Sequence, residues 1–197
     1  MKLANSKTYL NLAKSFAGEC QARTRYEFLE YGARKQGFVA LADLIDKVVY
    51  NEFNHARMFY TYLQDACDCT IDNIDICSGY PFKEKWNILD NLKIAAENEE
   101  IESTKVYPEY AKIADEEGFP EIAELYRNII QVENCHHMLF KELYEQMKND
   151  TMYCKNEPVK WKCGGCGYEE TAKSAWKCCP LCQAKQGSVL LKISDGE

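Results

Sequence analysis

The sequence predicts a mainly α-helical protein, in which an antiparallel four-helix bundle is followed by a small cysteine-rich module. Apolar residues recur every three or four positions from about residue 5 to 148, and breaks in this pattern leave four long segments. At 1.5 Å per residue, helices of about 30 residues are about 45 Å long, which is typical of such a bundle. The composition changes abruptly after Asn149, so we expect one domain over residues 1–149 and a second over 150–197.

The four predicted helices are separated by residues that disfavour helix. Gly37, the stretch 68–81 and the sequence Gly118-Phe119-Pro120 interrupt the periodicity. Pro108 falls within the third helix, where it removes one backbone donor, so we expect a kink or a local break there. The predicted helices span residues 5–36, 38–66, 84–117 and 120–148.

Composition and charge argue against several classes of protein. The 197 residues carry a formal net charge of −7, and no uncharged apolar run approaches the roughly 20 residues that a membrane helix needs. The N-terminal residues lack the apolar stretch of a signal peptide, so a cytoplasmic protein with no membrane partner is expected. An acidic chain is not expected to bind nucleic acid. The odd count of 11 cysteines, four of them in two CxxC pairs, favours metal binding over disulfides.

Certain glutamates lie on the apolar stripes of the predicted helices, where an unpartnered carboxylate is costly. Glu19 lies on the stripe of the first helix. The second and fourth helices each carry Glu-x-x-His on the stripe, as Glu52 with His55 and Glu133 with His136. The i, i+3 spacing places a carboxylate and an imidazole on one helical face, where both can bind a shared metal site.

The third helix offers two glutamate pairs with the same spacing. Glu99 and Glu102 follow an apolar-flanked stripe, whereas Glu97 and Glu100 follow a polar face. Periodicity therefore favours Glu99 and Glu102 as the inward pair.

The spacing of the inward glutamates repeats along the chain. Glu19 precedes Glu52 by 33 residues and Glu99 precedes Glu133 by 34, as expected for two similar helix pairs. Five glutamates and two histidines would hold two divalent cations, because five negative charges nearly cancel four positive ones. Oxygen-rich ligation with one imidazole per metal favours iron or manganese, and iron if redox chemistry follows.

Neighbouring residues allow other interpretations. His55 and His136 could instead be buried histidines hydrogen-bonded to glutamates. His137 lacks a glutamate three positions earlier, so we place it on the surface or behind a ligand. Cys20 and Cys135 adjoin ligand positions but point elsewhere on their helices, and are predicted to be packing thiols.

The C-terminal module contains C-x₂-C-x₁₂-C-x₂-C, formed by Cys163, Cys166, Cys179 and Cys182. This spacing is a strong signal for four thiolates around one metal ion. Cys178 is left over, since it has no cysteine three positions later. Spacing does not separate zinc, which would be structural, from iron, which would relay single electrons.

The chain resembles the rubrerythrin family over nearly its whole length. That family joins a ferritin-like diiron bundle to a rubredoxin-like domain, and its spacing back from Tyr107-Pro108 also selects Glu99 and Glu102. The residues that carry the resemblance are Gly18 to Tyr26, Glu52 to Arg57, Glu99 to Pro108, Glu133 to His137 and the paired CxxC knuckles.

The resemblance implies a role for each bundle ligand. Glu52 and Glu133 would bridge two irons, with Glu19 and Glu99 as terminal ligands and His136 on the second iron. The four cysteines would hold a third iron, for which zinc could substitute.

Two further roles follow from the resemblance. Glu102 would bind the first iron in the oxidised state and yield to His55 on reduction. Tyr26 and Tyr107 would hold ligand carboxylates by hydrogen bonds.

The activity that the resemblance implies is reduction of hydrogen peroxide to water in oxidative-stress defence. The four-cysteine iron would return electrons one at a time within a head-to-tail homodimer, supplied by a donor such as rubredoxin or an NADH-dependent reductase. One alternative is a ferritin-like ferroxidase or iron-handling protein, which the extra Glu102 and the relay domain disfavour. Another is a zinc-ribbon interaction protein, which leaves the inward glutamates unexplained.

The chain departs from the family pattern in two places. The connection over residues 65–83 is longer and carries Cys67, Cys69 and Cys77, which fit no strong metal template. We interpret them as incidental reduced thiols, with metal binding or oxidation as the alternative. Ser103 stands where family members often have an aromatic residue. Neither feature touches a predicted ligand.

Overall fold

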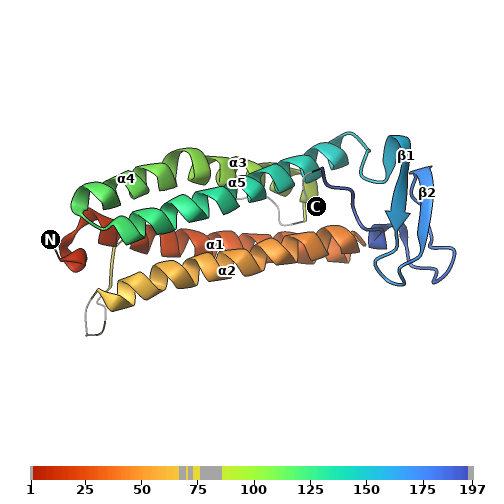
Figure 1. The fold of residues 1–197 in the computed structure, drawn as a ribbon. Coiled ribbons are helices and arrows are strands. Elements are labelled where there is room, and N and C mark those ends of the chain that lie inside the picture. Colours follow the sequence, from red (N-terminus) through yellow and green to blue (C-terminus); the bar gives the residue numbers. More distant parts are fainter. Residues whose placement is uncertain (1, 67–69, 71–72, 76–85, 195–197) are drawn as a thin grey trace.

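The computed structural model describes residues 2–66, 70, 73–75 and 86–194, and confirms the mainly helical bundle with a small C-terminal module (Figure 1). Cys67, Cys69 and Cys77 lie outside the described residues. None of the helices in the described ranges combines the length and apolar character needed to cross a bilayer. A short 3-10 turn, Leu3–Asn5, precedes the long helices α1 (Lys7–Lys35), α2 (Val39–Asp65) and α5 (Pro120–Lys148), and α1 packs along α2.

The third predicted helix is not continuous. It consists of α3 (Ile88–Ile101), a π-helical turn (Glu102–Val106) and α4 (Tyr107–Glu117), which together pack along α5. The expected break therefore lies just before Pro108, which occupies the first turn of α4, where its missing N–H costs little. Ser103 supports the π turn, since its hydroxyl donates to the carbonyl oxygen of Glu99 at 2.7 Å.

The start of α1 is held by a residue from the end of α4. The carboxylate of Glu117 accepts hydrogen bonds from the backbone N–H groups of Lys7 and Thr8, at 3.0 and 2.8 Å, and from the Thr8 hydroxyl at 2.6 Å. Burial raises the pKa of Glu117, but these hydrogen bonds outweigh it and hold the pKa below its usual value.

Replacing Glu117 by Ala is expected to destabilise the protein by about 1 kcal/mol at neutral pH, a typical capping loss. Because the pKa is lowered on folding, the stabilisation is complete above the ordinary pKa of glutamate and disappears as the pH falls through the lowered value. Thermal unfolding at several pH values checks this, with the exposed neighbour Glu116→Ala as control. Equal unfolding temperatures for both variants at pH 7 would contradict it.

The interior of the bundle consists of two apolar clusters. Leu29, Ile45 and Phe140 belong to one, and Leu12 and Phe59 belong to the other. Along α1, α2 and α5 the two clusters are separated by one or two buried charged side chains, and the buried Glu99 lies between the cluster residues of α3 and those of α4. The sequence pattern therefore builds a polar layer between two apolar blocks.

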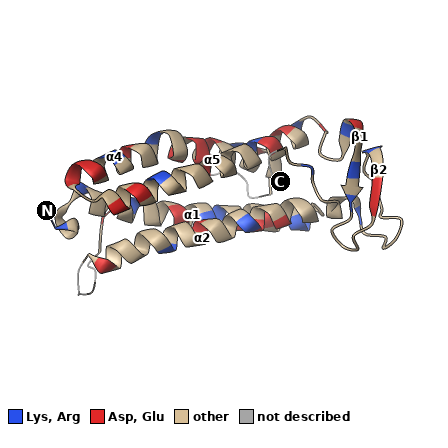
Figure 2. Ribbon diagram, in the orientation of Figure 1, with Lys and Arg blue, Asp and Glu red and all other residues tan. Residues whose placement is uncertain are grey.

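The C-terminal module is a two-stranded antiparallel sheet with loops that carry the cysteines. Strand β1 (Cys154–Lys162) pairs with β2 (Glu169–Ser174). Figure 2 shows charged residues on both strands, and Lys160 and Lys162 lie 3.2 and 3.4 Å from Glu169 across the sheet. The core is small and centres on Trp161, which is fully buried.

The module docks on the end of its own bundle. The side-chain amide of Gln146 donates to the carbonyl oxygen of Lys192 at 2.6 Å, and the backbone N–H of Ser194 donates to Glu142 at 2.9 Å. Gly187 lies so close to the α1–α2 turn that an added Cβ would clash with the carbonyl oxygen of Gly37. The division into domains 1–149 and 150–197 stays a prediction, although α5 ends at Lys148.

Candidate metal centres

Two groups of buried side chains occupy the polar layer of the bundle. The first contains Glu19 from α1, Glu52 and His55 from α2, and Glu133 from α5, with all ligand atoms within 4.8 Å of one another. The Nδ1 atom of His55 lies 2.9 Å from Glu133 Oε1, 3.2 Å from Glu52 Oε2 and 3.8 Å from Glu19 Oε2.

The second group shares two members with the first. It contains Glu52, Glu99 from α3, Glu133 and His136 from α5. The Nδ1 atom of His136 lies 2.8 Å from Glu133 Oε2 and 3.0 Å from Glu52 Oε1. Each shared carboxylate thus presents one oxygen to each histidine, which is the arrangement that two bridged metal ions require.

Two tyrosines orient the carboxylates that are not shared. The Tyr107 hydroxyl donates to Oε1 of Glu19, and the Tyr26 hydroxyl donates to Oε1 of Glu99. Both tyrosines are buried, so the bonds are shielded from water. The remaining oxygen of each glutamate is left to face the centre of its group, which is how outer hydrogen bonds orient metal ligands.

The residues present fit two divalent cations. Oε2 of Glu19 and Oε2 of Glu99 are buried without a hydrogen-bond partner, and Oε1 of Glu52 and of Glu133 each face the Nδ1 atom of a histidine. Such oxygens are costly unless a cation or a proton neutralises them. Carboxylate oxygens with one imidazole per metal suit iron or manganese.

The titration of the group agrees with this fit. Burial and the neighbouring carboxylates raise the pKa of Glu19 and of Glu99 well above the usual value. Burial also acts on Glu52, but hydrogen bonds with both histidines outweigh it and lower its pKa. At His136, burial lowers the pKa, but hydrogen bonds with Glu133 and then with Glu52 outweigh it and raise the pKa to about 9. The cluster therefore retains protons that bound cations would displace.

The structure separates the alternatives on the third helix. Glu99 is buried in the second group, whereas Glu97 and Glu100 are exposed. Glu102 is half-buried in the π turn and belongs to neither group, and burial followed by the shared glutamates raises its pKa to about 8. The first group contains His55 instead, so ligation by Glu102 stays a prediction.

Residues adjoining the ligands differ from expectation in one respect. Cys20 and Cys135 are exposed, so the prediction of packing thiols is wrong. Each residue advances a helix by about 100°, which carries both cysteines beyond the apolar stripe to the solvent side. His137 lies outside both groups, with Nδ1 2.8 Å from the carbonyl oxygen of Ala96.

Sequence reasoning missed one residue of the site. The side-chain amide of Asn51 on α2 lies 3.1 Å from Nε2 of His136 on α5. The two residues are 85 positions apart, and an asparagine at the edge of a helical stripe carries no signal of its own.

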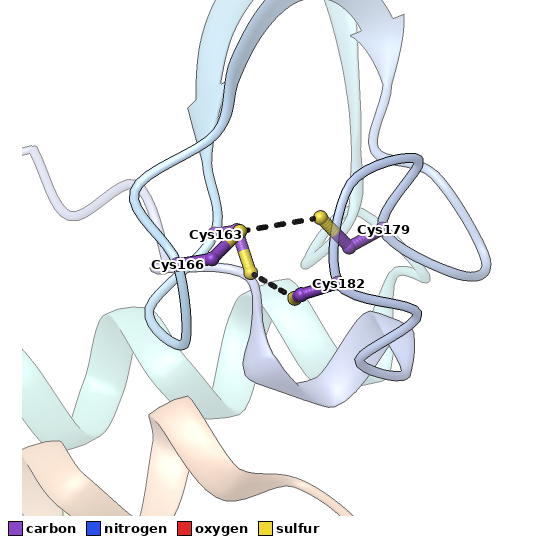
Figure 3. A group of neighbouring side chains, drawn as sticks. All are labelled: Cys163, Cys166, Cys179 and Cys182. Atoms are coloured by element: carbon purple, nitrogen blue, oxygen red, sulfur yellow. Dashed lines mark hydrogen bonds between the residues drawn. The ribbon is translucent and has the colours of Figure 1, made fainter.

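The four predicted cysteines meet in the C-terminal module (Figure 3). The sulfur atoms of Cys163 and Cys182 are 3.7 Å apart, and those of Cys166 and Cys179 are 3.6 Å apart. These distances are too long for disulfides. They approach the edge of about 3.8 Å of a sulfur tetrahedron with metal–sulfur bonds of about 2.3 Å.

The backbone also prepares this site for a metal. Burial raises the pKa of the Cys179 thiol, but the backbone N–H groups of Cys182 and Leu181 outweigh it and lower the pKa to about 7. Thiolates are the form that binds metal, so the four-cysteine cluster fits one iron or zinc ion.

Comparison with known proteins finds chains of similar sequence. The rubrerythrin family model matches residues 11–144. A rubrerythrin from Clostridium perfringens is 42% identical over 180 residues, which cover 91% of this chain and 91% of that protein. A rubrerythrin from Porphyromonas gingivalis is 34% identical over 184 residues, covering 93% and 89%.

Solved structures share the fold. Nigerythrin in its fully reduced, all-ferrous state matches with a TM-score of 0.62 at 20% identity, over 98% of this chain and 94% of that chain. A bacterioferritin from Desulfovibrio desulfuricans, described with its diiron site in different catalytic states, has a TM-score of 0.61 at 20% identity, over 74% and 82%.

Proposed function

The chain belongs to the rubrerythrin family, and from this premise we propose that it is a non-haem diiron peroxidase that reduces hydrogen peroxide to water. The observation that carries the proposal is the pair of overlapping ligand groups that share Glu52 and Glu133. Glu19, Glu99 and the two histidines would complete the site, and the four cysteines would hold a separate iron.

The residues of the bundle would prepare the site for this reaction. Iron held there would supply the two electrons that, with two protons, convert hydrogen peroxide to two water molecules. Tyr26 and Tyr107 hold the terminal carboxylates in one orientation. The apolar clusters on both sides exclude bulk water, which strengthens the electrostatic interactions within the site.

The position of the four-cysteine module supports electron transfer between chains. The module contacts its own bundle near the start of α2, and Glu52 lies 13 residues after Val39. At 1.5 Å per residue the separation along α2 is about 20 Å. Tunnelling rates fall steeply over such a distance, so we propose a head-to-tail homodimer in which each module serves the partner's bundle. A rubredoxin or an NADH-dependent reductase in the cytoplasm would be the upstream donor.

Anaerobic stopped-flow spectroscopy of the iron-loaded, fully reduced protein tests the proposal. The sample is mixed separately with hydrogen peroxide and with oxygen while the visible bands of both centres are followed. Fast reoxidation by peroxide, with slower reaction with oxygen, is expected. Preference for oxygen would favour the ferroxidase, and a four-cysteine site without iron colour would favour the zinc-ribbon protein.

Replacing Glu102 by Ala is expected to slow peroxide reduction by about tenfold or more, equivalent to about 1.4 kcal/mol in the barrier. The reason is that this substitution removes the carboxylate that the proposed exchange with His55 requires. Single-turnover rates check it, with the exposed Glu100→Ala as control. An undiminished rate in the Glu102 variant would show that the exchange is unnecessary.

A further inference from the structure

The two histidines of the bundle are held differently. Nδ1 of His136 faces the shared glutamates, and its Nε2 lies 3.1 Å from the side-chain amide of Asn51. Nδ1 of His55 faces the same glutamates, but its Nε2 has no hydrogen-bond partner among the described residues. The ring of His136 is therefore held at both nitrogens, and that of His55 at one.

The location of Asn51 suits a supporting role. It directly precedes Glu52, so it lies at the edge of the inward face of α2, half-buried. It also lines a surface pocket together with Tyr50 and Phe53. Asn51 thus lines this pocket and also contacts the imidazole of His136, which is 3% exposed.

The side-chain amide of Asn51 can pair with the imidazole of His136 whether the ring proton is on Nδ1 or on Nε2. When Nδ1 of a histidine binds a metal ion, the proton is on Nε2 and requires an acceptor. When Nδ1 keeps its proton in a neutral ring, Nε2 requires a donor. Rotation of the amide of Asn51 presents either its oxygen or its N–H, so neither form leaves Nε2 of His136 unpaired.

We propose that Asn51 is a positioning residue that fixes the ring of His136 for metal binding through Nδ1. The inference rests on the proposed function, because it assumes that the bundle holds metal ions. It also accounts for an asymmetry of the site, since a ring held at one nitrogen is free to move and a ring held at both is not. Loss of such an outer partner typically weakens metal affinity by about 10–100-fold.

Two variants of similar size separate the hydrogen bond from packing. Asn51→Leu fills the space but cannot pair with Nε2, whereas Asn51→Asp keeps an acceptor for the Nε2 proton. Asn54→Leu is the matched control, because Asn54 is also half-buried on α2 and bonds only locally, donating to the carbonyl oxygen of Tyr50 at 2.9 Å. Leucine is preferred to alanine, which would admit water as a substitute partner.

The measurement is equilibrium titration of the metal-free, full-length chain with Co²⁺, with the sulfur-to-cobalt bands of the four-cysteine site as an internal reference. One bundle ion is expected to bind about 10–100-fold more weakly in Asn51→Leu, and with wild-type affinity in Asn51→Asp and Asn54→Leu. Unchanged affinity in Asn51→Leu, or equal loss in Asn51→Asp, would overturn the inference while leaving the proposed function intact. Failure of the wild-type bundle to bind cobalt would overturn both.

Nuclear magnetic resonance of the zinc-loaded wild type gives a second test that does not depend on any variant folding. The Nε2 proton of His136 is expected to exchange with water more slowly than that of His55, because among the described residues His136 has the amide of Asn51 at its Nε2, and rotation of this amide presents its oxygen as an acceptor. Equal exchange rates for the two ring protons would also overturn the inference.

Discussion

Replacing Glu133 by Gln is expected to abolish binding of both bundle metals and, with it, peroxide reduction. Glu133 contributes one oxygen to each ligand group, so its loss affects both ions at once. An amide of the same size lacks the charge and the second anionic oxygen that bridging requires. Loss of a residue that hydrogen-bonds a metal ligand lowers metal affinity by up to about 100-fold, and loss of the ligand Glu133 should lower it further.

Metal analysis of the purified variant checks this result. Iron content should fall from about three ions per chain to about one, because the four-cysteine site remains as an internal reference. Glu97→Gln is the matched control, since Glu97 is exposed on α3. Retention of one bundle iron at wild-type affinity would show that Glu133 does not bridge.

Replacing both Cys179 and Cys182 by Ser is expected to have the second large effect. Two thiolates cannot hold the ion that four hold, and a module of this size depends on its metal for stability. Steady-state peroxide reduction driven by an NADH-dependent reductase should fall by about 100-fold or more, equivalent to about 2.7 kcal/mol. A single turnover of the pre-reduced bundle should keep its rate, because the bundle ligands are untouched.

The control for this experiment is the neighbouring cysteine. Cys178→Ser should change neither the iron colour nor turnover, since Cys178 lies outside the group of four and its sulfur accepts from Lys185 Nζ at 3.5 Å. Undiminished steady-state turnover in the double variant would show that electrons reach the bundle without the module.

Periodicity predicted the fold because the bundle depends on local patterns. The long helices end within a few residues of the breaks seen in the sequence, and α1 ends at Lys35 beside Gly37, which has a φ of 85°. The inward glutamates were visible for the same reason. A carboxylate within an apolar stripe, such as Glu19 or Glu133, stands out along a single helix.

The sequence-based predictions were wrong or incomplete where a feature depends on contacts between helices. Cys20 and Cys135 were expected to pack but are exposed. The part of a helix surface that becomes buried depends on how the neighbouring helices pack against it, and the sequence of one helix does not show this. The break near Pro108 was expected, but its form as a π turn carrying Glu102 depends on the packing of the third helix segment along α5.

Residue spacing was enough to predict the helical bundle, the four-cysteine module and the side chains that could bind metal, because spacing on a helix or in a knuckle is a local property. Which of these side chains lie together depended on how the helices pack. Packing brings Glu52 and Glu133 between the two histidines, places His55 rather than Glu102 in the first group, and sets Asn51 against His136. These contacts join different helices, and the relative rotation of the helices is set by packing of the whole core.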